Sequence, residues 1–248
     1  MSPQISAHFH NKKWFSFDLD DTLHEFRAAS GQASAAVFER IYALTGTTIS
    51  ALEATYADIL RASTTNAFTD GRSSAEYRRE RFSRLLKAHG VAELVDVESL
   101  LDTYQSSLKG YLKLKPDARS LLRTLHGQGK KILVVTEGPQ DAQLWTLQEL
   151  GLMPLVDVLV TTNEMRRSKV DGLFQAVLEK YAIPAPDMVY FGDSLARDIV
   201  PARELGISAV LFDERQEARL DDLGDLRVDS WGKVEELVVH HCTDQDIL

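Results

Sequence analysis

The sequence of 248 residues is 44% apolar and 26% charged, which suits one large soluble domain or a core domain with a smaller insert. Its formal net charge of -9 repels polyanions, so a nucleic-acid polymer is not expected as a partner. The one cysteine, Cys242, excludes an intrachain disulfide and favours a reducing compartment. No apolar run reaches the roughly 18 residues of a membrane span, so we expect a cytoplasmic protein without membrane contact.

Short apolar segments rich in β-forming residues predict five buried strands, at residues 14–19, 131–136, 156–161, 188–191 and 208–212. Helical patterns separate the later ones. In residues 141–150, for example, leucines recur on one helical face and Gly151 marks the end. Strands that alternate with helices predict an α/β fold with a parallel sheet.

About ninety residues separate the first predicted strand from the second, far more than one crossover helix needs. This insert has a helical pattern. Ser50 with Glu53, and Ser73 with Glu76, predict two capping boxes, and residues 97–112 predict a third helix. We therefore expect a helical cap domain at residues 24–114, inserted into an α/β core at residues 1–23 and 115–248. The cap arginines Arg72, Arg78, Arg79 and Arg81 either reach an anionic substrate or, as is commoner, form a solvated helix face.

Three carboxylates lie where the first strand ends, in the run Asp18-Leu19-Asp20-Asp21. Such a concentration of negative charge is costly unless a cation or a proton is shared, and a metal ion would relieve it. Asp18 and Asp20 are two residues apart and share a face of an extended strand, whereas Asp21 points elsewhere. Taken alone, the same run also fits an acidic loop after a strand.

Polar residues also follow the other strands. Thr136 ends the second strand, where it either holds phosphate oxygens or caps the helix that begins near Pro139. Lys169 follows the third strand, and Gly192-Asp193-Ser194 with Asp198 follows the fourth. In a parallel sheet, clusters that follow different strands meet at one edge, which is where α/β proteins bind ligands.

Together these residues resemble the four motifs of the haloacid dehalogenase superfamily, namely Asp18-x-Asp20-x-Thr22, Thr136, Lys169, and Gly192-Asp193-Ser194 with Asp198. The helical insert is similar to the smaller α-helical cap of that family. The resemblance implies a Rossmann-like core with a parallel sheet and the activity of a magnesium-dependent phosphatase. It also implies a small phosphorylated metabolite as substrate.

The resemblance further implies a role for each motif. Asp18 would be the nucleophile that forms an aspartyl-phosphate, and Asp20 the general acid and base. Mg²⁺ would be bound by the carboxylates of Asp18 and Asp193 and by the backbone carbonyl of Asp20.

The remaining motif residues would position the phosphoryl group. Thr136 and the backbone N–H of Glu137 would bind its oxygens, and Lys169 would offset the charge of the phosphate and of Asp18. Asp198 would fix Lys169 or a water on the metal, with help from Ser194.

Three alternatives stay open at this point. A sugar-phosphate mutase uses the same two aspartates, and a noncatalytic binding module can keep the same scaffold. A dehalogenase needs no acid for its leaving halide, so Asp20 argues against it. The sequence indicates neither the identity of the substrate nor the oligomeric state.

Overall fold

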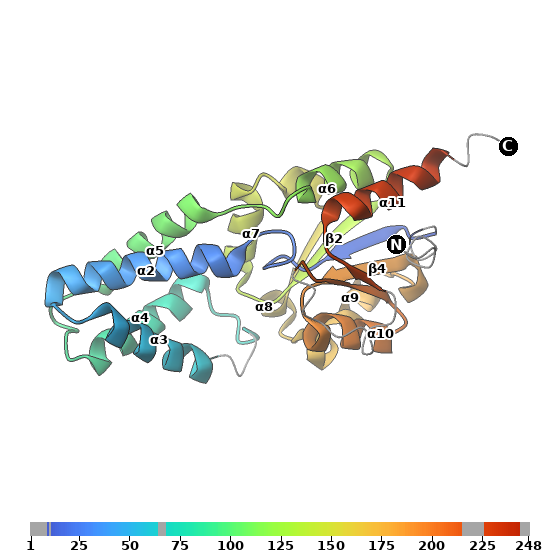
Figure 1. The fold of residues 1–248 in the computed structure, drawn as a ribbon. Coiled ribbons are helices and arrows are strands. Elements are labelled where there is room, and N and C mark those ends of the chain that lie inside the picture. Colours follow the sequence, from blue (N-terminus) through green and yellow to red (C-terminus); the bar gives the residue numbers. More distant parts are fainter. Residues whose placement is uncertain (1–8, 10, 64–67, 215–225, 244–248) are drawn as a thin grey trace.

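The computed structural model describes residues 9, 11–63, 68–214 and 226–243, and its centre is a parallel β-sheet (Figure 1). Within these residues the sheet has six strands in the order β3-β2-β1-β4-β5-β6. They are β1 (Trp14–Phe17), β2 (Lys131–Thr136), β3 (Val158–Thr161), β4 (Met188–Gly192), β5 (Ser208–Phe212) and β6 (Arg227–Val228). The predicted α/β class and its five strands are confirmed, while the short edge strand β6 is not foreseen by the sequence.

The strand order reverses between β1 and β4. Successive strands add toward β3 on one side of β1, whereas β4, β5 and β6 add on the other side. Phe17 pairs with Phe191, so the carboxyl ends of β1 and β4 lie next to each other. This reversal opens a crevice beyond the carboxyl ends of the strands, and the motif residues that follow β1 and β4 border it.

Helices cover both faces of the sheet (Figure 1). On one face, α6 (Ala118–Gly127), α7 (Gln140–Glu149) and α11 (Trp231–Thr243) share a hydrophobic cluster with Phe15 and Phe17 of β1. On the other face, α9 (Phe174–Lys180) and α10 (Val200–Glu204) pack on Leu133 and Tyr190. Strands that are buried on both faces read as continuous apolar runs, which is why the sequence identifies them. Short helical turns complete the core: η2 (Met153–Leu155), α8 (Thr162–Met165), η3 (Lys169–Leu173), η4 (Ala185–Asp187) and η5 (Leu195–Ile199).

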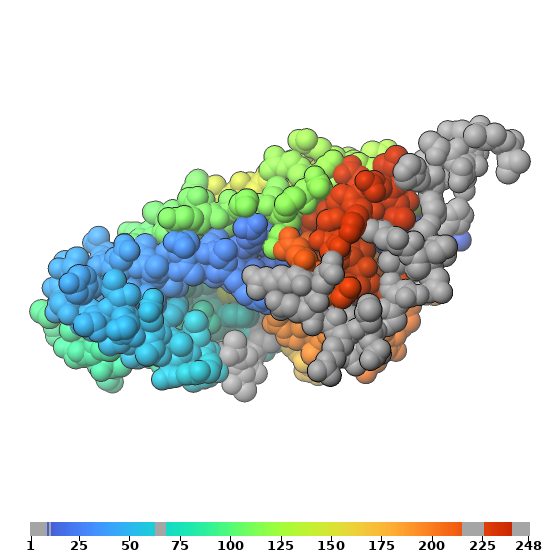
Figure 2. Space-filling view, viewed as in Figure 1, coloured from blue at the N-terminus to red at the C-terminus, as the bar shows by residue number. Residues whose placement is uncertain are grey.

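Of the five described helices between β1 and β2, the first four form a second lobe beside the core (Figures 1 and 2). They are α2 (Phe26–Thr45), α3 (Ile49–Ser63), α4 (Ser74–Ala88) and α5 (Val97–Tyr111). Their buried side chains, among them Phe82, Leu100 and Tyr104, make a hydrophobic cluster of their own. We call this lobe the cap. Its exact division from the core at residues 24 and 114 stays a prediction.

Two helix starts in the cap were predicted from capping boxes, and one of them is found. Ser73 caps α4, because its side chain accepts from the N–H of Glu76 while the Glu76 carboxylate accepts from the N–H of Ser73. The Ser50 box is wrong. Helix α3 already begins at Ile49, so Ser50 lies inside its first turn, and the N–H groups of Ala51 and Leu52 are bound by the carbonyl of Thr48 instead.

The two connections between the cap and the core run side by side. The N–H of Glu25 donates to the carbonyl of Lys113 at 2.9 Å, and the N–H of Lys115 donates to the carbonyl of Leu23 at 2.9 Å. His24 lies between these bonds and pairs with Leu114. The connections therefore form a short two-stranded hinge directly after the Asp18-Leu19-Asp20-Asp21 run.

Further contacts dock the cap on the core. Asp141 of α7 accepts from the N–H of Ser74 at 3.0 Å and from its hydroxyl at 2.7 Å, so a core residue binds the first turn of α4. Asn163 of α8 donates to the carbonyl of Phe68 at 3.3 Å and to that of Arg72 at 3.0 Å. In the described part of the chain, no helix combines the length and the apolar character needed to cross a bilayer.

Candidate active site

Asp18 continues β1 by one residue. Its N–H donates to the carbonyl of Phe191 at 2.8 Å, which extends the pairing with β4 and fixes the direction of the side chain. The carboxylate is buried and accepts from the hydroxyl of Thr22 at 3.2 Å. Trp231 of α11 holds the same loop by donating to the carbonyl of Thr22 at 3.1 Å. Asp21 has a left-handed backbone with φ of 62°, so it has left the extended strand, and its carboxylate pairs with Arg27 at 3.1 Å.

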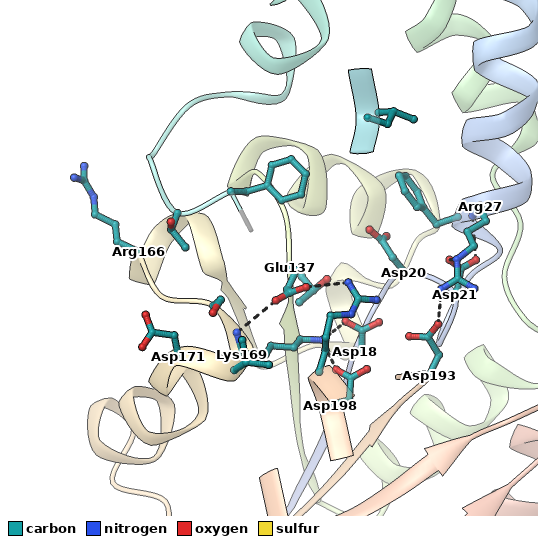
Figure 3. Close-up of a pocket in the computed structure, with 18 of the residues that line it drawn as sticks. Asp18, Asp20, Asp21, Arg27, Glu137, Arg166, Lys169, Asp171, Asp193 and Asp198 are labelled. Carbon is teal, nitrogen blue, oxygen red and sulfur yellow. Dashed lines mark hydrogen bonds and ion pairs between the residues drawn. The ribbon is translucent and has the colours of Figure 1, made fainter. Parts of the chain in front are cut away.

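Lys169 lies between two buried carboxylates (Figure 3). Its ammonium group is 2.5 Å from Asp18 Oδ1 and 2.6 Å from Asp198 Oδ1, although these residues follow three different strands. Asp198 also accepts from the hydroxyl of Tyr190 at 2.9 Å and from the N–H of Ser194 at 3.0 Å. The predicted convergence of the first, third and fourth motifs is therefore present in the structure.

Gly192 allows Asp198 to approach this cluster. A Cβ at position 192 would lie 2.4 Å from Asp198 Cγ, far inside ordinary contact. The backbone of β4 and the Asp198 side chain are therefore packed against each other, and a residue with any side chain at 192 would force Asp198 to move.

The cluster has more negative charge than its cations offset. Burial raises the pKa of Asp18 to about 8, even though Lys169 opposes the rise. Burial and then the charge of Asp198 raise the pKa of Asp193 as well. For Lys169, burial alone would lower the pKa, but the charges of Asp18 and Asp198 outweigh it and hold the pKa above its ordinary value. Burial thus disfavours the charged forms of Asp18 and Asp193, which positive charge nearby would stabilise.

Asp20 is held by two partners that the sequence does not indicate. Nε2 of the buried His24 lies 2.8 Å from Asp20 Oδ1, and the amide of Gln143 donates to Asp20 Oδ2 at 3.3 Å. His24 comes from the hinge and Gln143 from α7, so both the cap connection and the core orient this carboxylate. The other ring nitrogen of His24, Nδ1, is buried and has no hydrogen-bond partner within the described residues.

Thr136 and Glu137 lie at the end of β2, beside this cluster. Helix α7 is preceded by Pro139 and has no side-chain cap, so the alternative in which Thr136 caps that helix is wrong. The Thr136 hydroxyl is buried at the wall of the site, 3.5 Å from Gln143 Oε1. The Glu137 carboxylate faces the core, where it accepts from Arg197 at 3.1 Å and lies 3.5 Å from the N–H of Lys169.

Asp193 and Ser194 follow β4 but face in different directions. Asp193 Oδ2 accepts from Arg27 of the cap at 3.0 Å, in a contact between the cap and the core. The hydroxyl of Ser194 accepts from the N–H of Arg197 at 3.3 Å and so caps η5. In the structure the Ser194 backbone, and not its side chain, supports Asp198.

The predicted Mg²⁺ ligands fit that ion in kind. Asp18 and Asp193 follow neighbouring strands and provide the hard oxygen donors that Mg²⁺ prefers. Within the described residues, no three side chains of the His, Cys, Asp or Glu types form a metal-binding group. The predicted ligand set does not require three such side chains, because its third ligand is the backbone carbonyl of Asp20.

A cavity of about 940 Å³ lies between these residues and the cap (Figure 3). Such a volume is ample for a small metabolite. The core contributes the motif residues, while the cap contributes Phe26, Leu60, Phe68 and Arg81. The catalytic candidates therefore line the floor of a cavity whose walls come from both the core and the cap.

Comparisons with known proteins agree with this architecture. The family model of haloacid dehalogenase-like hydrolases matches residues 12–206. A ribulose-1,5-bisphosphate 5-phosphatase of Halopiger xanaduensis is 30% identical over 235 residues, which cover 90% of this chain and 97% of that protein. A glyceraldehyde 3-phosphate phosphatase of Methanocaldococcus jannaschii is 29% identical over 139 residues, 55% of this chain and 61% of that protein.

Solved structures show the same fold. The magnesium-bound YfnB hydrolase of Bacillus subtilis has a TM-score of 0.71 at 22% identity, over 92% of this chain and 99% of that one. A 2-haloacid dehalogenase of Pseudomonas syringae has a TM-score of 0.68 at 21% identity, with the same coverage. The chain belongs to the haloacid dehalogenase-like hydrolase family and is an enzyme of the phosphatase type within it.

Proposed function

We propose that the protein hydrolyses a small phosphate monoester through an aspartyl-phosphate on Asp18, with Mg²⁺ as its metal ion. One observation carries the proposal. Asp18 is buried against Lys169 at the floor of a cavity, while Asp20, two residues along, is held by His24 and Gln143. A nucleophile beside a fixed cation and a separately oriented acid are the groups that two-step phosphoryl transfer requires.

In the first step, a carboxylate oxygen of Asp18 attacks phosphorus, and the bond between phosphorus and the ester oxygen breaks. Asp20 gives its proton to the leaving oxygen. In the second step, water attacks phosphorus, Asp20 takes the proton of that water, and the bond between phosphorus and Asp18 breaks. Free phosphate leaves, and both carboxylates return to their first state.

The other residues position and balance charge in this proposal. Lys169 offsets the charge on the phosphoryl oxygens, and Asp198 keeps Lys169 in place through the 2.6 Å contact. Thr136 and the backbone N–H of Glu137 bind phosphoryl oxygens at the end of β2. Ser194 acts through its backbone on Asp198.

Mg²⁺ would be held by the carboxylates of Asp18 and Asp193 and by the backbone carbonyl of Asp20. When bound, it supplies the positive charge that lets an anionic carboxylate and a phosphate approach each other. Burial raises the pKa of Asp18 and of Asp193, so a cation bound between them would favour their charged forms.

The substrate class follows from the cavity and the relatives. A cavity of about 940 Å³ beside the cap has the size of a small-molecule site and supports a small metabolite as substrate. The similar proteins of Halopiger and Methanocaldococcus are named for a sugar bisphosphate and a triose phosphate. We propose a small phosphorylated metabolite of that size.

The test measures phosphate release from p-nitrophenyl phosphate and from a panel of phosphometabolites, with Mg²⁺ and with EDTA. We expect activity that EDTA abolishes and Mg²⁺ restores. Asp18→Asn is expected to keep the wild-type circular dichroism spectrum and to lose at least about a thousandfold in kcat, since it removes the nucleophile. The wild type, treated with fluoroberyllate, should form an adduct on Asp18 that the variant lacks.

The matched control is Asp187→Asn, the same chemical change just before β4, where Asp187 pairs with Lys13 at 3.1 Å. This variant should keep wild-type kinetics. Retention of activity by Asp18→Asn would refute the nucleophile. Release of an isomerised phosphate ester in place of inorganic phosphate, stimulated by a sugar bisphosphate, would identify the mutase alternative instead.

A further inference from the structure

The four cap arginines named from the sequence lie on α4 and the turn before it, and Arg81 differs from the other three in its contacts. Arg72 pairs with Glu80 at 2.7 Å, and Arg79 pairs with Glu98 at 2.5 Å. Arg78 donates to Gln105 at 2.9 Å. These three face protein partners. Arg81 makes no ion pair with any described residue, and it is the one of the four that lines the cavity.

Aromatic rings hold the guanidinium of Arg81. It lies 5.8 Å from the ring centre of Phe68 and 5.9 Å from that of Tyr77, within the range of cation–π contacts. Its Nε is buried and, among the described residues, has no hydrogen-bond partner. A buried donor without an acceptor is costly, so the described protein groups do not fully satisfy the guanidinium of Arg81.

Arg81 lines the same cavity as Asp18 and Asp20, whereas Arg72, Arg78 and Arg79 do not line it. Arg81 therefore lies on the side of α4 that borders the catalytic candidates.

The other cations near the floor already face carboxylates. Lys169 contacts Asp18 and Asp198, and Arg197 pairs with Glu137 at 3.1 Å. Arg27 contacts Asp193 at 3.0 Å. Arg166 is exposed at the rim, and Figure 3 shows its side chain pointing away from the cluster around Lys169. Among the described residues of the cap that line the cavity, Arg81 is thus the cation that no carboxylate pairs with.

We propose that Arg81 binds a second anionic group of the substrate, a phosphate or a carboxylate, while the scissile phosphate lies on Asp18. This inference rests on the proposed function and names its substrate class: small phosphate monoesters that carry another negative group at the far end. The planar guanidinium binds the two oxygens of such a group side by side, which a lysine in the same place does not.

The test compares pairs of substrates that differ in the second charge. Fructose 1,6-bisphosphate against fructose 6-phosphate tests a distal phosphate, and 3-phosphoglycerate against glycerol 3-phosphate tests a distal carboxylate. p-Nitrophenyl phosphate, which has no second charge, reports the basal chemistry. The enzymes are the full chain, Arg81→Gln, Arg81→Lys, and the control Arg79→Gln from the outer side of the same helix.

We expect the wild type to prefer the doubly charged member of at least one pair by about tenfold or more in kcat/KM. Arg81→Gln should lower kcat/KM for that member by about tenfold to a hundredfold, the range for a charge-assisted hydrogen bond. Its kcat/KM for p-nitrophenyl phosphate should change less than about twofold. Arg81→Lys should recover part of the loss, and Arg79→Gln should match the wild type.

The pair that shows the preference identifies the second group as a phosphate or a carboxylate. Equal losses of Arg81→Gln on all five compounds, or no loss on any, would overturn the role of Arg81 and leave the phosphatase assignment standing. A wild type that is folded and active on none of the compounds would overturn both.

Discussion

Gly192→Ala tests whether the approach of Asp198 to the β4 backbone holds the charge cluster together. The new Cβ would lie 2.4 Å from Asp198 Cγ, 2.6 Å from its Cβ and 2.6 Å from its Oδ2. Ordinary contact begins at 3.4 Å, so Asp198 must retreat by about 1 Å. Asp198 Oδ1 is 2.6 Å from Lys169, and a retreat of that size breaks the contact.

The magnitude follows from these distances. Overpacking a buried site costs about 1–3 kcal/mol, and separating a buried ion pair adds to this, so we expect a loss of about 2–4 kcal/mol in the free energy of unfolding. Lys169 loses one of its two anchors, and a misplacement of about 1 Å at a catalytic group lowers the rate about a hundredfold. Urea unfolding and steady-state kinetics measure the two effects.

The control is Gly31→Ala in α2, where a Cβ meets no atom within 4 Å. It should raise stability by about 0.5–1 kcal/mol, because alanine is the better helix former. In an Asp198→Gly background, the same Gly192→Ala change should cost less than about 0.5 kcal/mol, since the clashing side chain is gone. A Gly192→Ala variant with wild-type stability and kcat would refute the reasoning.

Two further predictions concern contacts away from the cluster. The Asp157 carboxylate accepts from the N–H of Ile132 and from Lys131. Burial alone would raise the pKa of Asp157, but these hydrogen bonds outweigh burial and lower it. The contribution of the carboxylate to stability is therefore present above about pH 4 and is lost in more acidic solution. Asp157→Ala should therefore cost about 1–2 kcal/mol in urea unfolding at pH 7 and less near pH 3.5, and a cost independent of pH would contradict this. Asp141→Ala removes the core acceptor for the first turn of α4, so we expect KM to rise about fivefold with kcat nearly unchanged, and a wild-type KM would exclude a role for Ser74 and Asp141 in docking the cap.

Local sequence patterns were sufficient to predict the strands and part of the cap. The strands at residues 131–136 and 208–212 match β2 and β5 in full, because burial on both faces leaves an unbroken apolar run. Helix α5 ends within one residue of its predicted end. Helix α2 is not foreseen, although it is the longest in the cap. Its buried face includes small residues such as Ala29 and Ala33, so the difference in hydrophobicity between its buried and exposed faces is too small to reveal a helix in the sequence.

The site divides in a similar way. Asp18, Lys169 and Asp198 could be placed together because each follows a strand of one parallel sheet, and topology fixes where such residues meet. The partners of Asp20 could not be placed. Gln143 is 123 positions away on a helix, where a buried glutamine has no pattern that links it to a particular carboxylate. Arg27 reads as part of a hinge, and its contact with Asp193 depends on how the cap sits on the core.

The hinge has a further consequence for turnover. His24, which touches the carboxylate of Asp20, also pairs with Leu114 in the two-stranded segment that carries the cap. A swing of the cap about that segment would thus be transmitted directly to the group that moves the proton. Cleavage of the substrate would then occur only in the closed conformation. After the cap opens to release the product, the enzyme would have to close again before the next cleavage.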